Sequence, residues 1–156
     1  MTATEREKPV GRTKDGTYQV GVRRTFATSP EDAWDVLTSP AGLAIWLGGE
    51  VGLVKGAAYQ TSEAAGQVRV VSPGSHLRLT WQPDGWAAAS TIQVRVLPTA
   101  SGATVSFHQE RMPGAAERES MHRRWSAALD RLAALLGEES GIGNQELGFN
   151  VLSPSQ

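Results

Sequence analysis

The side chains best suited to proton transfer or metal binding near neutral pH are the three histidines of the chain, His76, His108 and His122. No two of them have the spacing of a metal-ligand motif such as His-Glu-x-x-His, so we expect no metal site. With His108, the nearby acids Glu110, Glu117 and Glu119 could form an acid–base set. Because acidic side chains are mostly exposed, surface charge is the better interpretation, and we expect no catalytic residue.

The sequence lacks the common nucleophile and phosphate-binding motifs. Cysteine is absent, which excludes disulfides, thiolate nucleophiles and cysteine-based zinc or iron–sulfur sites. No serine lies in a Gly-x-Ser-x-Gly motif, so a hydrolase elbow is unsupported. Gly48-Gly49 and Gly52 lack both the Walker lysine–serine pair and the spacing of a dinucleotide-binding loop. We therefore expect no cofactor, and an enzyme is the less favoured interpretation.

The chain is rich in tryptophan, with five in 156 residues. Aromatic side chains can line a pocket for an apolar or aromatic ligand, because such pockets are mostly apolar with few polar groups. The residues predicted to line this cavity are Trp34, Trp46, Tyr59, Trp81, Trp86, Phe107, Gln109, Met121, Trp125 and Leu129. Plain core packing is the alternative for each tryptophan, since aromatic side chains dominate core area in any case.

Two polar members of this set, Tyr59 and Gln109, are predicted to face inward. Gln109 continues the apolar face of its strand, where a buried amide needs hydrogen-bond partners. A ligand or a neighbouring side chain could supply them, and we favour the neighbouring side chain. Trp86 follows the turn Pro83-Asp84-Gly85, which places it at a rim, as a lid or as a partly buried loop residue.

The elements that would position these side chains begin with a strand from Thr17 to Phe26. Its apolar residues fall on even positions, and only Arg24 interrupts that face. Ser29-Pro30 and Ser39-Pro40 then predict two short helices, because serine can cap a helix and proline suits its first position. Gly48-Gly49 ends the second of these helices.

Alternation of apolar and polar residues between turn signals predicts six further strands. They lie near residues 50–54, 57–62, 66–72, 76–82, 89–97 and 103–110. The last three have one mainly apolar face, which suits an antiparallel sheet covered on one side. After Met112-Pro113-Gly114 the apolar period changes to 3.6 residues, which predicts one long amphipathic helix over 116–136, ended by Gly137.

Charge excludes some classes of partner. The formal net charge of −1 gives no global field to recruit nucleic acid or anionic lipid, so we expect neither nucleic acid nor membrane as a partner. Positive charge gathers around the long helix, at Arg111, Arg118, Arg123, Arg124 and Arg131. Interspersed acids favour a solvated helix face there over a site for an acidic partner or an anionic head group.

The length of the chain suits one domain. We interpret residues 1–16 as a polar N-terminal arm, 17–137 as the folded domain and 138–156 as a flexible C-terminal tail. No apolar run has the form of a signal peptide or the length of a membrane span, so we expect a bacterial, cytoplasmic protein.

The order of the elements requires the sheet to curl around the final helix, because a single sheet needs its apolar face covered. This order and several local strings resemble the helix-grip (START-like, SRPBCC) superfamily, most closely the bacterial branch of the Hsp90-ATPase-activator-homologue family. The strings are Ala27-Thr28-Ser29-Pro30-Glu31 before Trp34, Thr38-Ser39-Pro40 before Trp46, Leu77-Arg78-Leu79-Thr80-Trp81, Thr104-Val105-Ser106-Phe107-His108-Gln109-Glu110, and Trp125 to Leu132. The resemblance covers residues 17–136.

The resemblance implies an α+β helix-grip fold, with a curved antiparallel sheet of about six or seven strands wrapped around a long C-terminal helix. With the inward tryptophans, it favours binding of a small hydrophobic or aromatic molecule between sheet and helix, without assigned chemistry. One alternative is an interaction protein that modulates the ATPase of an Hsp90-type chaperone. The second is an enzyme similar to polyketide cyclases or aromatases. A monomer and a homodimer are both compatible with the sequence.

Overall fold

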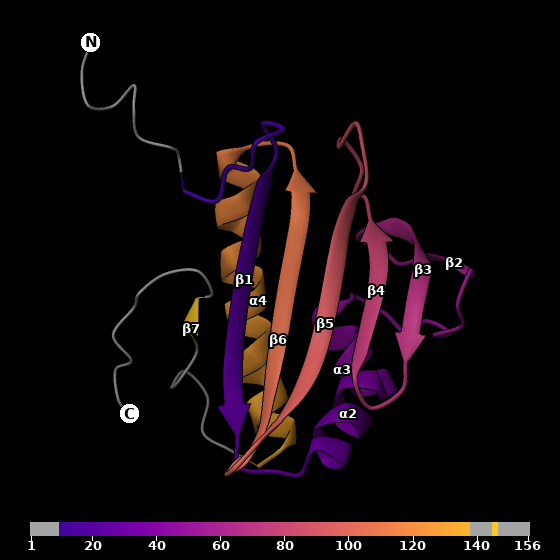
Figure 1. Cartoon of the computed structure of the whole chain (residues 1–156). Coiled ribbons are helices and arrows are strands. Elements are labelled where there is room, and N and C mark those ends of the chain that lie inside the picture. The colour runs from indigo at the N-terminus through magenta and orange to yellow at the C-terminus, as the bar shows by residue number, and fades with distance from the viewer. Residues whose placement is uncertain (1–9, 138–144, 147–156) are drawn as a thin grey trace, which may run out of the picture.

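A single antiparallel sheet forms the frame of the computed structural model, which describes residues 10–137 and 145–146. Its strands are β1 (Tyr18–Phe26), β2 (Ala58–Gln60), β3 (Ala65–Ser72), β4 (His76–Trp81), β5 (Ser90–Thr99), β6 (Gly102–Met112) and β7 (Gln145–Glu146). The strand order is β2-β3-β4-β5-β6-β1-β7, so the first strand pairs with the last long one (Figure 1). The helix-grip architecture expected from the sequence is confirmed.

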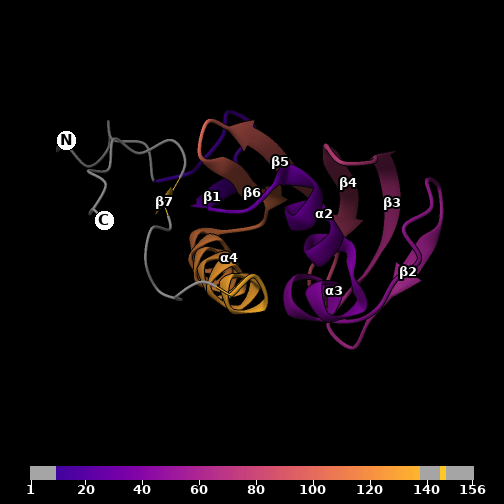
Figure 2. The same ribbon diagram turned by 90° about the horizontal axis from the view of Figure 1, so that it is seen from below.

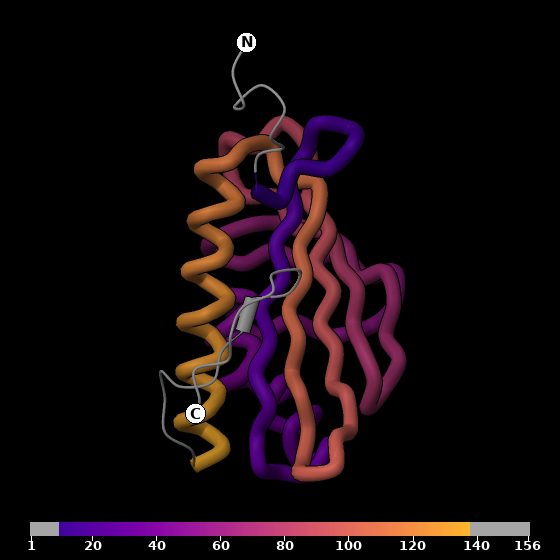
Figure 3. Tube along the Cα trace, turned by 60° about the vertical axis from the view of Figure 1, so that its left-hand side comes forward, coloured from indigo at the N-terminus to yellow at the C-terminus, as the bar shows by residue number. Residues whose placement is uncertain are grey.

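Three helices cover one face of this sheet: α2 (Pro30–Thr38), α3 (Pro40–Trp46) and α4 (Ala115–Leu135). Seen from below, α4 lies against the β1–β6 half and the two short helices lie against the rest (Figure 2). The side view shows α4 running along the strands on one side of the sheet (Figure 3). The buried core lies between these layers, and no helix of the described residues covers the opposite face of the sheet.

The helix boundaries follow from local capping, as the sequence predicts. Ser29 Oγ accepts a hydrogen bond of 3.0 Å from the Asp32 amide, and Ser39 Oγ accepts one of 3.0 Å from the Gly42 amide. Gly137 follows α4 with φ +80°, a conformation that glycine adopts without steric cost, and its amide donates to the Ala134 carbonyl.

The predicted strand near 50–54 is wrong. These residues form a loop between α3 and β2, and the next strand is reduced to Ala58–Gln60. The apolar alternation there has another cause: Val51 and Leu53 pack against the core while Val54 is 64% exposed. The Val54 amide donates to the Gly52 carbonyl two residues earlier, so this backbone turns on itself instead of joining the sheet.

Arg24, which breaks the apolar face of β1, is a buried arginine with a specific partner. Its side chain is 5% exposed, and its Nη1 lies 3.3 Å from Oδ1 of Asp130 on α4. The guanidinium carbon also lies 5.3 Å from the centre of the Phe26 ring. The residue therefore ties β1 to the long helix, which explains its inward position.

The two chain ends are described only in part. Residues 1–9, 138–144 and 147–156, which make up most of the predicted arm and tail, lie outside the described residues. Within the N-terminal arm, Arg12 forms a bridge with Tyr18, and the Gln19 amide donates to the Gly11 carbonyl. From the tail, β7 pairs with Val22 and Arg23 of β1. No helix in the described part of the chain is long and apolar enough to cross a membrane.

Candidate functional site

A pocket of about 370 Å³ opens between the β4–β5 turn and the first half of α4. One wall is formed by Trp81, Pro83 and Trp86. The other is formed by Ala116, Glu117, Ser120, Met121 and Arg124. Most of the α4 residues are spaced by three or four positions, so one face of the helix makes this wall. The pocket therefore lies at one end of the sheet–helix sandwich.

Trp81 and Trp86 form the aromatic wall. Their rings pack edge to face, with centres 5.6 Å apart and planes at 85°. The turn that carries Trp86 is fixed by two hydrogen bonds: its amide donates to the Pro83 carbonyl, and Gln82 Nε2 donates to the Trp86 carbonyl at 2.7 Å. Trp86 is half-buried while Trp81 is 4% exposed, so Trp86 forms the rim of the pocket and Trp81 its base.

Arg124 closes the helix side of the pocket. Its guanidinium carbon lies 5.2 Å from the centre of the Trp81 ring and 5.7 Å from that of Trp125. One terminal nitrogen donates to the Trp46 carbonyl at 3.0 Å and to Glu63 Oε1 at 2.5 Å. The charge of Arg124 is thus paired with a carboxylate and flanked by two indole rings, which attract a cation.

Two shielded donors belong to the residues of this pocket. Neither Trp81 Nε1 nor Arg124 Nε has a hydrogen-bond partner among the described residues. A buried donor without a partner costs about 1–3 kcal/mol, and the ring faces beside Arg124 offset part of that cost. These two donors without hydrogen-bond partners distinguish the pocket from the packed core beneath it.

The core beneath the pocket is filled by aromatic side chains. The Phe107 ring is stacked on Trp125 at 4.7 Å and 10°, and Trp46 packs against Phe107 at 5.8 Å. Trp46 Nε1 donates to the Leu37 carbonyl at 2.9 Å. All three aromatic residues are fully buried, and none of them lines the pocket.

Gln109 is satisfied by its neighbours, as the sequence interpretation favoured. Its Oε1 accepts a hydrogen bond of 3.0 Å from Trp125 Nε1, and its Nε2 donates to Ser90 Oγ at 2.9 Å. Ser90 Oγ in turn donates to the Trp81 carbonyl at 2.7 Å. This chain of hydrogen bonds links the helix, the middle of the sheet and the base of the pocket.

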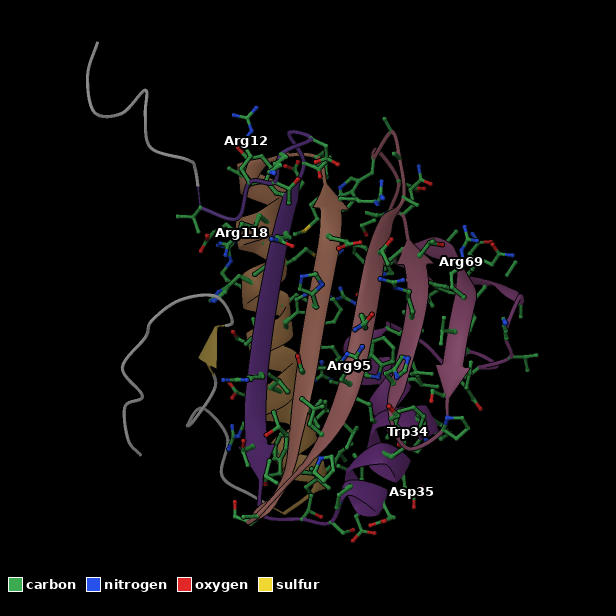
Figure 4. All side chains as sticks on the ribbon, viewed as in Figure 1. Arg12, Trp34, Asp35, Arg69, Arg95 and Arg118 are labelled. Atoms are coloured by element: carbon green, nitrogen blue, oxygen red, sulfur yellow. The ribbon has the colours of Figure 1, made fainter. Side chains whose placement is uncertain are left out.

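The structure brings together only part of the set predicted to bind a ligand. Trp81, Trp86 and Met121 line the pocket, whereas Trp46, Phe107, Gln109, Trp125 and Leu129 are buried in the core and do not line it. Tyr59 packs over Gly66 and donates its hydroxyl to the Thr80 carbonyl, and burial raises its pKa. Trp34 lies on α2, at the far end of the sheet from the β4–β5 turn (Figure 4).

Sequence reasoning missed Arg124, Glu117, Ser120, Ala116 and Pro83 as pocket residues. From the sequence, Arg124 is expected on the solvated face of the long helix, off its apolar stripe, because acids are interspersed with the arginines there. Its position in the sequence, directly before Trp125 and three residues after Met121, could have indicated a place at the pocket, since such a position borders the apolar stripe of the helix. A long arginine stem can lie there on apolar surface.

The arrangement is suited to binding. Among the described residues that line the pocket, Glu117 is the only carboxylate and there is no histidine. In the described part of the chain, no group of three histidine or acidic side chains is placed to hold a metal ion. Because Glu63 pairs with Arg124 and Glu117 adds a negative charge, the pocket offers little attraction to an anion.

His108 lies on the face of the sheet opposite the helices, and its environment predicts that the stability of the protein depends on pH. Its Nε2 lies 3.3 Å from Gln19 Oε1. Burial lowers the pKa of His108 below 6.5. The negative charge of Glu110 opposes this lowering, and the positive charge of Arg78 adds to it. The folded state therefore binds the proton less well, so His108's contribution to stability is present above pH 6.5 and is lost as the pH falls below it.

We expect His108→Gln to flatten the loss of stability on acidification. The measurement is urea unfolding of both proteins at about pH 7.5 and about pH 5.5. An equal acid-induced loss in the variant and the wild type would contradict the assignment of this titration to His108.

Comparison with known proteins places the chain by its sequence and fold. The family model described as Activator of Hsp90 ATPase homolog 1-like protein matches residues 27–137. No curated protein matches the sequence. Among solved structures, protein CV1439 from Chromobacterium violaceum is 26% identical, with a TM-score of 0.65, over 78% of this chain and 98% of that one.

Two more distant structures share the fold. CalU16 from Micromonospora echinospora is 17% identical, with a TM-score of 0.69, over 86% of each chain. PFC0360w from Plasmodium falciparum, described as an HSP90 activator, is 14% identical, with a TM-score of 0.62, over 80% of this chain and 99% of that one. At these identities the likeness is one of fold.

Proposed function

The chain belongs to the Activator of Hsp90 ATPase homolog 1-like family, and from this premise we propose that it binds a small, uncharged aromatic molecule in the pocket between the β4–β5 turn and α4. The observation that carries the proposal is the pocket itself. Its volume of about 370 Å³ falls within the range of small-molecule sites. Two tryptophans on one side and Met121 on the other offer apolar and aromatic contact.

The polar groups define the class of ligand. An anion would meet Glu117, and it would compete with Glu63 for Arg124, so a neutral molecule is favoured. Trp81 Nε1 and Arg124 Nε are donors without acceptors among the described residues. A ligand that carries an acceptor oxygen could pair with them once a side-chain movement exposes these atoms, whereas a hydrocarbon of the same shape would leave them unpaired.

The experiment is a thermal-shift screen against aromatic ketones, flavonoids, polyketide-like aromatics, lipids and common metabolites. A ligand that binds only the folded state adds about 2.7 kcal/mol of stability at about a hundredfold excess over its dissociation constant. We expect a dose-dependent shift from neutral aromatic compounds, and a smaller shift from the corresponding carboxylates.

Two matched variants locate the site. Ser120→Phe places a bulky ring in the pocket from an exposed helix position and should abolish the shift. Ala127→Phe adds the same ring at an exposed position about two helical turns along α4, away from the lining residues, and should retain it. An equal shift in wild type and Ser120→Phe, or no shift from any compound, would contradict the proposal.

A second candidate function is modulation of the ATPase of an Hsp90-type chaperone. It is supported by the family description and by the likeness in fold to the Plasmodium falciparum activator. A change in the ATPase rate of a bacterial Hsp90 on addition of the protein would favour this candidate. The same change in Ser120→Phe would show that it does not need the pocket.

A further inference from the structure

The face of the sheet opposite the helices is rich in arginine. The strands β1, β3, β4, β5 and β6 contain six arginines and a single acid, Glu110. In the whole chain the two charges are nearly balanced, with 15 basic and 16 acidic residues. Acids are thus sparse in these five strands, which are locally basic although the protein as a whole is not; the short edge strand β7 adds Glu146.

Strand register places three of these arginines on the outer face. The side chains that alternate with them, such as Val22, Leu79 and Val94, are buried against the helices. Arg23 and Arg78 are exposed and Arg95 is half-buried. Figure 4 views the sheet from this side, and Arg95 is labelled on β5.

None of the three arginines faces an acid across the strands. Arg23 pairs with Ser106 on one side and with Gln145 of β7 on the other. Ser106 pairs in turn with Arg95, and Arg95 pairs with His76 on the next strand. Arg78 lies opposite Gln93. By contrast, the buried Arg24 and the half-buried Arg124 each have a carboxylate partner within 3.3 Å. Arg95 Nε and Nη2 lie 2.6 and 2.9 Å from the neutral amide of Gln93. The charges of these three arginines are therefore not balanced by an acid across the described strands.

The spacing of these charges suits an extended chain. Arg23 and Arg95 are two strands apart, roughly 10 Å, and Arg78 is a diagonal neighbour of Arg95, roughly 7–8 Å away. In an extended peptide, alternate side chains lie on one side at intervals of roughly 7 Å. Carboxylates at alternate positions of a peptide match the Arg78–Arg95 interval, and the long side chains of Arg23 and Arg95 span the rest of the wider interval between them.

A nucleic acid fits this face less well. Proteins that bind single strands stack the bases on aromatic side chains. The aromatic residues of these strands, Tyr18, Phe26, Trp81 and Phe107, are all buried in the core or packed against it. The net charge of −1 also gives no long-range attraction for a polyanion.

We propose that the outer face of the sheet, at Arg23, Arg78 and Arg95, docks an extended acidic segment of a partner protein with carboxylates at alternate positions. This surface lies on the opposite side of the sheet from the helices that line the pocket, so it is independent of the proposed small-molecule site. Bidentate arginine–carboxylate pairs on a flat surface give modest, salt-sensitive affinity, which is typical of a transient contact.

The test is fluorescence anisotropy with a labelled peptide of alternating glutamate and threonine, at low and at raised ionic strength. The variant Arg23→Gln, Arg78→Gln, Arg95→Gln is compared with Lys55→Gln, Arg123→Gln, Arg131→Gln, which removes the same charge from exposed positions elsewhere. We expect the first variant to weaken binding about tenfold and the second to change it little.

Several outcomes would overturn the proposal. They are equal weakening by the two variants, the absence of peptide binding at low ionic strength, and tighter binding of an oligothymidylate of equal charge or of anionic vesicles. Unfolding midpoints of both variants near that of the wild type show that the fold is retained, which is expected because none of the substituted side chains is buried.

Discussion

Trp125→Ala is expected to lower the free energy of unfolding by about 3–5 kcal/mol, the range seen when a large aromatic core residue is truncated. Trp125 is fully buried, its ring is stacked on Phe107 at 4.7 Å, and its Nε1 donates to Gln109 Oε1. The substitution removes the stacking and leaves the amide oxygen of Gln109 without this donor. Urea denaturation of both proteins measures the difference.

Trp125→Phe separates the two contributions. It retains an aromatic ring beside Phe107 but removes the donor to Gln109, so an intermediate loss of about 1–3 kcal/mol is expected. A loss below about 1 kcal/mol in the alanine variant would contradict the tight packing described around Trp125 in the middle of α4.

Arg124→Leu is expected to destabilise the protein by about 2–3 kcal/mol. The substitution removes the contacts with the rings of Trp81 and Trp125 and leaves the Trp46 carbonyl without its arginine donor. Glu63 is 44% exposed and can regain water, so the loss of the ion pair itself contributes little.

Arg123→Leu is the matched control for this prediction. The neighbouring arginine is exposed, so the same substitution there should change the free energy of unfolding by no more than about 0.5 kcal/mol. Equal urea denaturation curves for the two variants would show that Arg124 acts as an ordinary surface charge.

Most of the fold could be predicted because local signals and long-range packing agree. The serine–proline pairs at Ser29 and Ser39 start helices where the sequence indicates, and the change of period after Gly114 marks α4. Residues 50–54 were mispredicted because an extended loop that packs Val51 and Leu53 on the core has the same alternation as a strand. Only pairing partners distinguish the two.

The candidate site was harder to predict, because it depends on which aromatic residues are left uncovered. Trp46 and Trp81 have similar sequence signals, yet Trp46 packs against Phe107 inside the core and Trp81 forms the base of a pocket. The difference arises from the β4–β5 turn and from Arg124, which meet Trp81 only in three dimensions. The alternation of apolar and polar residues predicts which side chains point inward, but it does not predict which other side chains pack against them.

The clustering of arginines on the outer face of the sheet could not be predicted from the sequence either. Along the sequence, the arginines of the strands alternate with apolar residues, a pattern that predicts ordinary solvent-exposed positions. Antiparallel register collects Arg23, Arg78 and Arg95 from three strands onto one surface, and this cannot be read from net charge.

The measurement that tests the pocket most directly is an NMR titration of the five tryptophan indole N–H signals with the compound that gives the largest thermal shift. Binding in the pocket should move the signals of Trp81 and Trp86, which line it. The signals of Trp46 and Trp125, whose N–H groups are hydrogen-bonded to Leu37 and Gln109 in the core, should change little. Movement of the Trp46, Trp125 or Trp34 signals with Trp81 and Trp86 unchanged would place the ligand elsewhere and contradict the account.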